Sequence, residues 1–161
     1  MNSLPHKSIF ARGVWYVVIQ GVLIGLILFG PHGTLLVASE PLATTLKSCG
    51  IAIGFLACLI MAIAVINLGR NLTPLPCPKD DAVLIQSGLY RFVRHPIYFG
   101  VLLAAFAWAL IFPGVYILMY SLGLFLLFEI KARREEVWLV ERFPEYQEYQ
   151  LRVKKLIPGI Y

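Results

Sequence analysis

The sequence predicts an all-α integral membrane protein with about four transmembrane helices and both termini on the cytoplasmic side. Three observations predict this fold class. The chain is 59% hydrophobic and only 14% charged, whereas a soluble domain carries roughly 25% charged residues. Its apolar residues are gathered in long runs, which gives a mean hydropathy of +0.76. Its basic residues fall almost entirely between alternate runs.

The apolar runs predict helices at about 14–30, 46–68, 96–112 and 115–143. A spanning helix needs roughly 20 apolar residues, with a range of about 17–25. The run from Cys49 to Leu68 meets that length, while each of the others alone also fits a buried helix of a soluble protein. Together the runs leave too little polar surface to solvate a globule. No internal repeat or low-complexity tract divides the chain, so we expect residues 1–161 to form one membrane-embedded domain.

The first run extends from Val14 to Phe29 and is apolar except for Gln20 and glycines. Lys7 and Arg12 precede it and the small residues of segment 37–39 follow it, a pattern that also fits a cleaved signal peptide. We favour an uncleaved span.

The distribution of basic residues predicts the orientation of the helices. With the N-terminus inside, the inner segments are 1–13, 69–96 and 129–161, and Lys47 is the basic residue that falls outside them. Lys and Arg mark the cytoplasmic side of a membrane protein. The positive charge is therefore explained by topology and lipid headgroups, and no nucleic-acid partner is needed. We expect a multi-pass protein of a bacterial or archaeal inner membrane.

The connections between the helices follow from proline and glycine. Residues 30–46 are expected to form the outer loop, and the proline-rich segment 74–78 a stiff inner loop that leads to a short extended piece at 82–85. Pro96 suits the first position of the third helix. Pro113-Gly114 predicts a tight turn, which makes a helical hairpin of the last two spans. Beyond residue 128 the pattern becomes amphipathic and is interrupted by Pro144. The segment that follows, with Tyr146, Tyr149 and Leu156, is expected to lie as an amphipathic helix in the membrane interface.

Ionisable and aromatic residues are concentrated in segments 88–98 and 129–136, and an antiparallel hairpin brings these two segments side by side. Each residue also has a plain explanation, as a helix-end anchor, a solvated ion pair or an interfacial aromatic. Glu129 is harder to explain in this way, because a carboxylate next to an apolar run is costly unless it is paired or faces a wet cavity. The spacing of Glu129, Arg133 and Glu136 puts them on one helical face, where they would line such a cavity or form an ion-pair ladder.

Two sequence elements resemble a signature of small membrane methyltransferases. The first is Ser87-Gly88-Leu89-Tyr90 followed by Arg94-His95-Pro96-Ile97-Tyr98, and the second combines Glu135-Glu136 with Phe143-Pro144-Glu145-Tyr146. The chain resembles the isoprenylcysteine carboxyl methyltransferase and phospholipid methyltransferase superfamily over roughly residues 66–158. It departs from the family pattern at Pro144, where a glycine is usual, and at Lys131, where an arginine is common.

The resemblance implies S-adenosyl-L-methionine as cofactor and a hydrophobic or lipid-borne methyl acceptor, either isoprenylcysteine carboxylate-like or phospholipid amine-like. It places the cofactor region at about 82–158 and the active site on the cytoplasmic face. It implies cofactor-binding roles for Val83, Leu84, Ile85, Tyr90, Arg94, His95, Pro96, Tyr98, Glu135 and Glu136. It implies catalytic roles for His95, Arg133 and Glu136, substrate contacts for Lys131, Glu129 and Arg152, and no metal. Which of Glu135 and Glu136 faces the cofactor is left open, as is the oligomeric state.

Two other functions remain open at this point. Membrane sterol reductases resemble the same region around His95 but use NADPH, and they are typically much longer chains. A non-enzymatic scaffold or transporter subunit would use Glu129 and the basic residues as an ion-pair network. A soluble Rossmann-type methyltransferase is not supported, because no G-x-G-x-x-G follows a strand.

Overall fold

The structure is a computed structural model that describes residues 13–33, 39–79 and 81–161. Within these ranges the chain is helical and contains no strand, apart from an isolated parallel bridge between Val93 and Lys154. The helices are α1 (Val14–Phe29), α2 (Glu40–Leu68), α3 (Pro96–Ile111), α4 (Val115–Arg142) and the short α5 (Tyr146–Arg152), with 3-10 turns η1 (Gly69–Asn71) and η2 (Gly88–Arg91).

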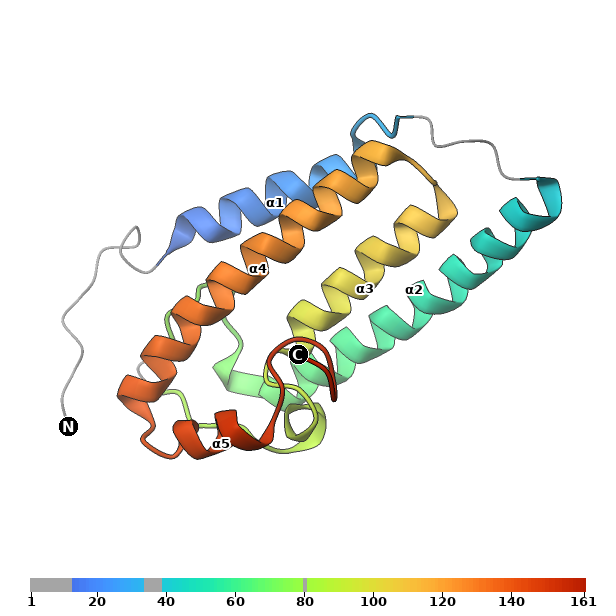
Figure 1. Ribbon diagram of the computed structural model, residues 1–161. Coiled ribbons are helices and arrows are strands. Elements are labelled where there is room, and N and C mark those ends of the chain that lie inside the picture. The colour runs from blue at the N-terminus through green and yellow to red at the C-terminus, as the bar shows by residue number, and fades with distance from the viewer. Residues whose placement is uncertain (1–12, 34–38, 80) are drawn as a thin grey trace.

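The four long helices run up and down as a bundle (Figure 1). α3 packs against α2 on one side and α4 on the other, while α1 packs mainly against α4. Segment 69–95 and the chain after α4 gather at one end of the bundle, where α2 and α4 finish and α1 and α3 begin. We call this the polar end. Residue 13 and the C-terminus both lie there, so the described ends of the chain share one side of the bundle.

Two helices are long and apolar enough to cross a membrane. These are the segment Glu40–Asn71, with a hydropathy of 2.8, and Val115–Arg142, with a hydropathy of 1.7. α1 and α3 are apolar too but have only 16 residues each. Large apolar side chains point outward from the bundle, including Phe29 (87% exposed), Phe55 (75%) and Ile66 (75%). An apolar surface of this extent suits lipid rather than water.

Small residues let α2 and α3 approach closely. A Cβ on Gly100 would lie 2.5 Å from Met61 Cγ, and one on Gly50 would lie 2.8 Å from the carbonyl oxygen of Ala107. Such contacts between small residues are how membrane helices associate, because apolar side chains gain little by leaving lipid for protein. This close contact holds α3, and therefore the residues at its start, against the end of α2.

The second helix begins earlier than the sequence pattern indicated. It starts at Glu40 rather than at about residue 46, because Pro41 occupies its first turn, where a proline loses no hydrogen bond. The hydroxyls of Thr44 and Thr45 then donate to the carbonyls of Glu40 and Pro41. The other long helices begin and end within one residue of the expected ranges. Lys7, Arg12 and residues 37 and 38 of the signal-peptide alternative lie outside the described residues.

The aromatic residues of the segment after α4, a segment expected to lie in the membrane interface, pack against the rest of the protein. Tyr146 and Tyr149 are each only 2% exposed and Leu156 is fully buried. The backbone amides of Arg94 and His95 donate to the carbonyls of Lys154 and Lys155, at 2.8 and 3.0 Å. These residues thus pack onto the segment that leads into α3, a contact between distant parts of the chain.

Candidate active site

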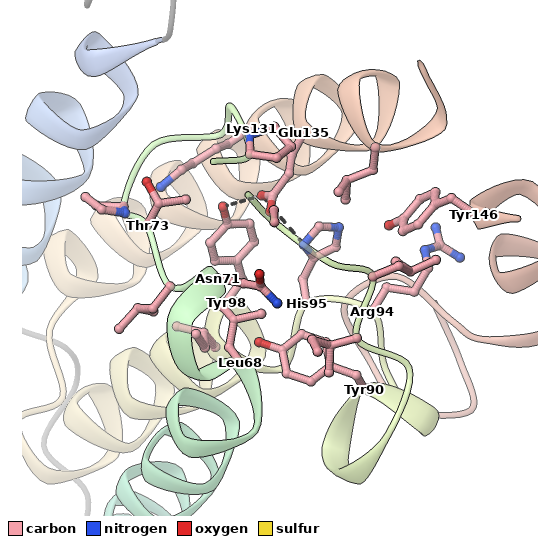
Figure 2. A pocket seen from close by; sticks show the side chains of 18 of the residues that line it. Leu68, Asn71, Thr73, Tyr90, Arg94, His95, Tyr98, Lys131, Glu135 and Tyr146 are labelled. Carbon is pink, nitrogen blue, oxygen red and sulfur yellow. Dashed lines mark hydrogen bonds and ion pairs between the residues drawn. The ribbon is translucent and has the colours of Figure 1, made fainter. Parts of the chain in front are cut away.

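A cavity of about 370 Å³ opens at the polar end of the bundle. All four long helices contribute to its walls, and residues 71–74, 78 and 82–85 also line it (Figure 2). The polar side chains that line it, from N- to C-terminus, are Gln20, Asn71, Thr73, Tyr90, Arg94, His95, Tyr98, Lys131, Glu135, Tyr146 and Tyr149.

His95 stands immediately before α3 and is held from several sides. Its backbone φ and ψ are −123° and 65°, as Pro96 at the first helical position requires a non-helical residue before it. Its ring Nε2 lies 3.1 Å from Glu136 Oε1, and Nδ1 lies 3.8 Å from Glu135 Oε2. A carboxylate only accepts hydrogen bonds, so Nε2 carries a proton. The ring also stacks on Tyr98, with 5.2 Å between centroids, and its orientation is therefore fixed before any ligand arrives.

Glu136 is buried behind the cavity and does not line it. Its carboxylate accepts hydrogen bonds from Arg94 Nε (2.7 Å) and Gln150 Nε2 (3.1 Å), besides the bond from His95. The Tyr146 hydroxyl is at 3.5 Å. The Arg94 guanidinium in turn donates to the carbonyls of Gln150 and Val153. A buried charge is tolerated when it is paired and hydrogen-bonded in this way. Glu136 is therefore the counterion of Arg94 and holds Arg94, His95 and Gln150 together.

Glu135 faces the cavity and is the next residue along α4. Its side chain is 26% exposed, and Oε2 accepts a hydrogen bond of 2.7 Å from the Tyr98 hydroxyl. Tyr98 stacks on Phe128, with 4.6 Å between ring centroids. Figure 2 shows Glu135, Tyr98 and His95 pointing toward one another. Neighbouring acids on one helix thus have different surroundings, since Glu136 is buried among donors and Glu135 is open to a ligand.

Three tyrosines of the polar end are buried as neutral hydroxyls. Burial raises the pKa of Tyr90, Tyr146 and Tyr149 well above the ordinary value, and nearby Glu135 or Glu136 raises each further. The Tyr149 hydroxyl donates to the carbonyl of Tyr90. The cavity therefore meets aromatic faces and protonated hydroxyls, and the tyrosines carry no charge at neutral pH.

Lys131 lines the cavity one helical turn before Glu135 and is only 2% exposed. Its ammonium donates to Gln20 Oε1 of α1 at 2.8 Å. It also lies 5.1 Å from the centroid of the Tyr98 ring and 5.9 Å from that of Phe128. A cation over aromatic faces is stabilised electrostatically.

Residues 82–85, which cover the cavity, are held in place by hydrogen bonds to the side chain of Asn71. Asn71 Nδ2 donates to the carbonyl of Val83 at 3.0 Å, and Asn71 Oδ1 accepts from the Val83 amide at 3.1 Å. This pair of bonds resembles the pairing of two backbone segments, although residues 82–85 form no strand. Val83, Leu84 and Ile85 line the cavity as a result.

Several residues expected at the site lie elsewhere. Arg133 has 69% of its side chain exposed and pairs with Glu129 at 2.5 Å, outside the cavity lining. Glu129 also binds Lys155 at 2.8 Å, and exposed Arg152 contacts Gln86. Pro96 is buried but does not line the cavity. Glu129 and Arg133 form the expected ion pair, but Glu136 turns to Arg94 and His95 instead of joining them. In this structure Arg133, Glu129 and Arg152 stand outside the cavity lining.

Sequence reasoning also missed residues that line the cavity, namely Gln20, Asn71, Thr73, Tyr146 and Tyr149. Gln20 had a detectable signal, because an amide inside an apolar helix marks a polar contact within a membrane protein. The tyrosines had none, since an aromatic residue near a helix end equally suits the interface. Among the described residues no group of His, Cys, Asp and Glu side chains could hold a metal ion.

A second cavity of about 290 Å³ lies among the long helices and is almost wholly apolar. Val101 lines both cavities, so they adjoin at the first turns of α3. The other lining residues of this apolar cavity are Ile24, Ile27, Leu28, Met61, Ala104, Ala105, Trp108 and Leu124.

The chain is similar to membrane methyltransferases. The family model of the isoprenylcysteine carboxyl methyltransferase (ICMT) family matches residues 50–141. A protein-S-isoprenylcysteine O-methyltransferase of Schizosaccharomyces pombe is 33% identical over 120 residues, which is 68% of this chain and 49% of that protein. The cobalt-zinc-cadmium resistance protein CzcN of Cupriavidus metallidurans is 30% identical over 156 residues, 92% of this chain and 63% of that protein.

A solved structure shares the fold. The eukaryotic intramembrane Ras methyltransferase ICMT superimposes with a TM-score of 0.65 and 25% identity, covering 96% of this chain and 55% of that one. The chain spans about half the length of the curated isoprenylcysteine methyltransferases that it matches. The matched segment runs from α2 through α4 and contains His95, Tyr98, Glu135 and Glu136. The chain therefore belongs to the isoprenylcysteine carboxyl methyltransferase family.

Proposed function

We propose that this protein transfers a methyl group from S-adenosyl-L-methionine to a hydrophobic or lipid-borne acceptor. The observation that carries the proposal is the junction of two cavities. One is lined by His95, Tyr98, Lys131 and Glu135, and the other is apolar and adjoins it at Val101. A cavity that carries charged and polar side chains, beside one that is almost wholly apolar, suits a cofactor and an acceptor with a hydrocarbon tail.

The residues of the polar cavity fit this cofactor. Its volume of about 370 Å³ falls within the range of roughly 300–1,000 Å³ that is usual for ligand pockets. The carboxylate of Glu135 suits the methionyl ammonium or the ribose hydroxyls. The faces of Tyr90 and Tyr98 suit a sulfonium through cation–π attraction. Backbone groups of segment 82–85 suit the edge of an adenine.

When bound, S-adenosylmethionine supplies an electrophilic methyl group, which an acceptor atom displaces while the electron pair of the broken carbon–sulfur bond stays on sulfur. The protein supplies chiefly position and exclusion of water for such an in-line displacement. Pro74, Pro78 and segment 82–85 cover the cavity. His95 orients ligands through its fixed ring, and Glu136 acts through His95 and Arg94 as a positioning residue.

The names of the relatives suggest isoprenylcysteine as the acceptor, and a phospholipid amine is the other acceptor we consider. A carboxylate acceptor needs no general base. An amine acceptor would lose a proton, and His95 is the ring nitrogen base at the cavity. In either case Ile24, Met61 and Trp108 of the apolar cavity would contact the hydrocarbon chain.

We also propose that α1 to α4 all cross the membrane, with the polar end and both termini on the cytoplasmic side. Described basic residues support this, because Arg70, Lys79, Arg91 and Arg142 lie at the polar end while Lys47 lies toward the other end of α2. The source membrane we propose is a bacterial or archaeal inner membrane.

Calorimetry in detergent tests the cofactor, and transfer of a radioactive methyl group to N-acetyl-S-farnesylcysteine and to phosphatidylethanolamine tests the reaction. We expect S-adenosylhomocysteine to bind, and one of the acceptors to be labelled. Binding of NADPH in its place would indicate a reductase. A well-folded sample that binds neither cofactor would favour the scaffold alternative. A His95→Ala or Glu135→Gln variant that binds S-adenosylhomocysteine unchanged would remove that residue from the proposed cofactor site.

A further inference from the structure

Lys131 is a buried cation without a matching anion. Apart from tyrosine and cysteine, the buried ionisable side chains of the described residues are His95, Lys131 and Glu136. Glu136 forms an ion pair with Arg94 and accepts a hydrogen bond from His95, whereas no carboxylate oxygen of the described residues lies within 4.0 Å of the Lys131 ammonium. Burying a charge is unfavourable unless something compensates it, and in a membrane protein such a residue marks a functional site by default.

The groups that do surround this ammonium hold it without neutralising it. The ammonium donates at 2.8 Å to Gln20 Oε1, the oxygen of a neutral amide, and the rings of Tyr98 and Phe128 lie 5.1 and 5.9 Å away. An ammonium has three N–H donors, and one is taken by Gln20. The remaining donors are open to a ligand, because both Lys131 and Gln20 line the cavity.

Gln20 comes from α1, which precedes the segment matched by the family model. It is the amide of an otherwise apolar helix of 16 residues, and an unpaired amide facing lipid would be costly. Its contact with Lys131 joins α1 to α4 across 111 positions of the chain. The first helix therefore contributes a side chain to the cavity as well as apolar packing.

The charges of the cavity are separated along α4. Lys131 precedes Glu135 by four residues, which is a rise of roughly 6 Å along a helix. Glu135 makes the anionic part of the cavity together with Tyr98 and His95, and Lys131 makes the cationic part together with Gln20. The anionic part suits a positively charged sulfonium, and the cationic part suits a negatively charged group of the acceptor.

We propose that Gln20 is a positioning residue that aims the Lys131 ammonium at the anionic group of the methyl acceptor. The inference rests on the proposed function and deepens it. The anionic group is a carboxylate in an isoprenylcysteine-like acceptor or a phosphate in a phospholipid. The site rejects an acceptor that places a neutral or cationic group next to the Lys131 ammonium, because this ammonium would then stay buried without an anionic partner.

The decisive variant is Gln20→Glu, which places a carboxylate beside the ammonium and neutralises it. If Gln20 only holds helices together, this change keeps or raises the melting temperature and leaves kinetics alone. If Gln20 and Lys131 form an anion site, the melting temperature is kept while KM for N-acetyl-S-farnesylcysteine rises about tenfold or more, as charged hydrogen bonds are the strong ones. Gln20→Leu tests the loss of the amide, and the exposed Gln147→Leu on α5 is the matched control.

The measurements are made on the full chain in detergent, with wild-type binding of S-adenosylhomocysteine and wild-type methyl transfer recorded first. A wild-type protein without either activity refutes the proposed function. With both present, we expect Gln20→Glu to raise KM while kcat and the affinity for S-adenosylhomocysteine stay within about twofold. Inhibition by the neutral primary amide of the farnesylcysteine probe is expected to strengthen, because the neutralised ammonium no longer opposes a neutral group. The same KM series with phosphatidylethanolamine distinguishes a phosphate from a carboxylate.

Two results overturn the inference. One is an unchanged KM for both acceptors in a folded Gln20→Glu variant. The other is a loss of affinity for S-adenosylhomocysteine with acceptor KM unchanged, which would assign Lys131 to the cofactor carboxylate.

Discussion

The imidazole of His95 and the carboxylate of Glu136 meet at 3.1 Å between Nε2 and Oε1, although the residues are 41 positions apart. The contact joins the start of α3 to the last turns of α4 behind the cavity. Glu135, the neighbour of Glu136, reaches the front of the same histidine at Nδ1. His95 thus lies between Glu136, which is buried behind the cavity, and Glu135, which faces the cavity.

Replacing Glu136 by Gln should destabilise the protein by about 3 kcal/mol, because it leaves the buried Arg94 and His95 without their counterion. Thermal unfolding in detergent measures the effect, and loss of ligand binding should accompany the loss of stability. A variant with the wild-type melting temperature would show that Glu136 does not hold this corner together.

Replacing Glu135 by Gln should leave the stability of the protein unchanged and weaken ligand binding. Its side chain is partly exposed in the cavity, and an amide can still accept the Tyr98 hydroxyl, so the melting temperature should stay close to that of wild type. The affinity for S-adenosylhomocysteine should fall at least tenfold, since a charged acceptor is lost. Calorimetry on both glutamate variants side by side gives the comparison, and equal affinities would contradict the division of roles.

Replacing Arg133 by Ala should leave kcat, KM and the melting temperature near their wild-type values. Its side chain is mostly exposed and pairs with Glu129 outside the cavity, and ion pairs in water contribute little. Steady-state methyl transfer measures the outcome. A large fall in kcat would restore the catalytic role that the sequence resemblance implies.

Replacing Asn71 by Leu should weaken binding of S-adenosylhomocysteine roughly threefold to tenfold, because the cover of the cavity loses two hydrogen bonds to Val83. Asn71→Asp keeps the acceptor for the Val83 amide and should show a smaller effect. Binding measured by calorimetry decides, and an unchanged affinity in the leucine variant would show that segment 82–85 is held by other contacts.

Replacing Gly88 by Ala should destabilise the fold by about 1–2 kcal/mol or more, since its φ of +61° is in the left-handed region. The added Cβ would also lie 2.1 Å from Asn67 Oδ1, which accepts the amide of Leu89. Gly123→Ala is the control, because its Cβ meets only Leu23 at 3.5 Å in ordinary contact. Melting temperatures of the two variants should therefore differ clearly.

Much of the architecture could be read from local patterns. Apolar runs, Pro96 at a helix start and the Pro113-Gly114 turn predicted three of the long helices to within a residue at each end. The start of the second helix was misjudged because Pro41 is compatible with both a loop and a first helical turn. The hairpin of α3 and α4 was also foreseeable, and with it the meeting of His95 with Glu135 and Glu136.

The direction in which each side chain points could not be predicted from local sequence patterns. Glu129, Arg133 and Glu136 have the spacing of one helical face, yet Glu129 binds Arg133 and Lys155 while Glu136 binds Arg94. Gln20 and Lys131 are 111 positions apart, and their contact depends on how α1 packs on α4.

The order of apolar and polar residues along the chain is enough to specify helices, turns and the end of the bundle that carries the ionisable groups, because hydrogen bonding and hydrophobicity act over a few residues. Which carboxylate is buried, which faces the cavity and which cation is left unpaired depends on contacts between distant segments. Those contacts form only when the helices pack together, and burial then changes the free energy of each charge according to its neighbours.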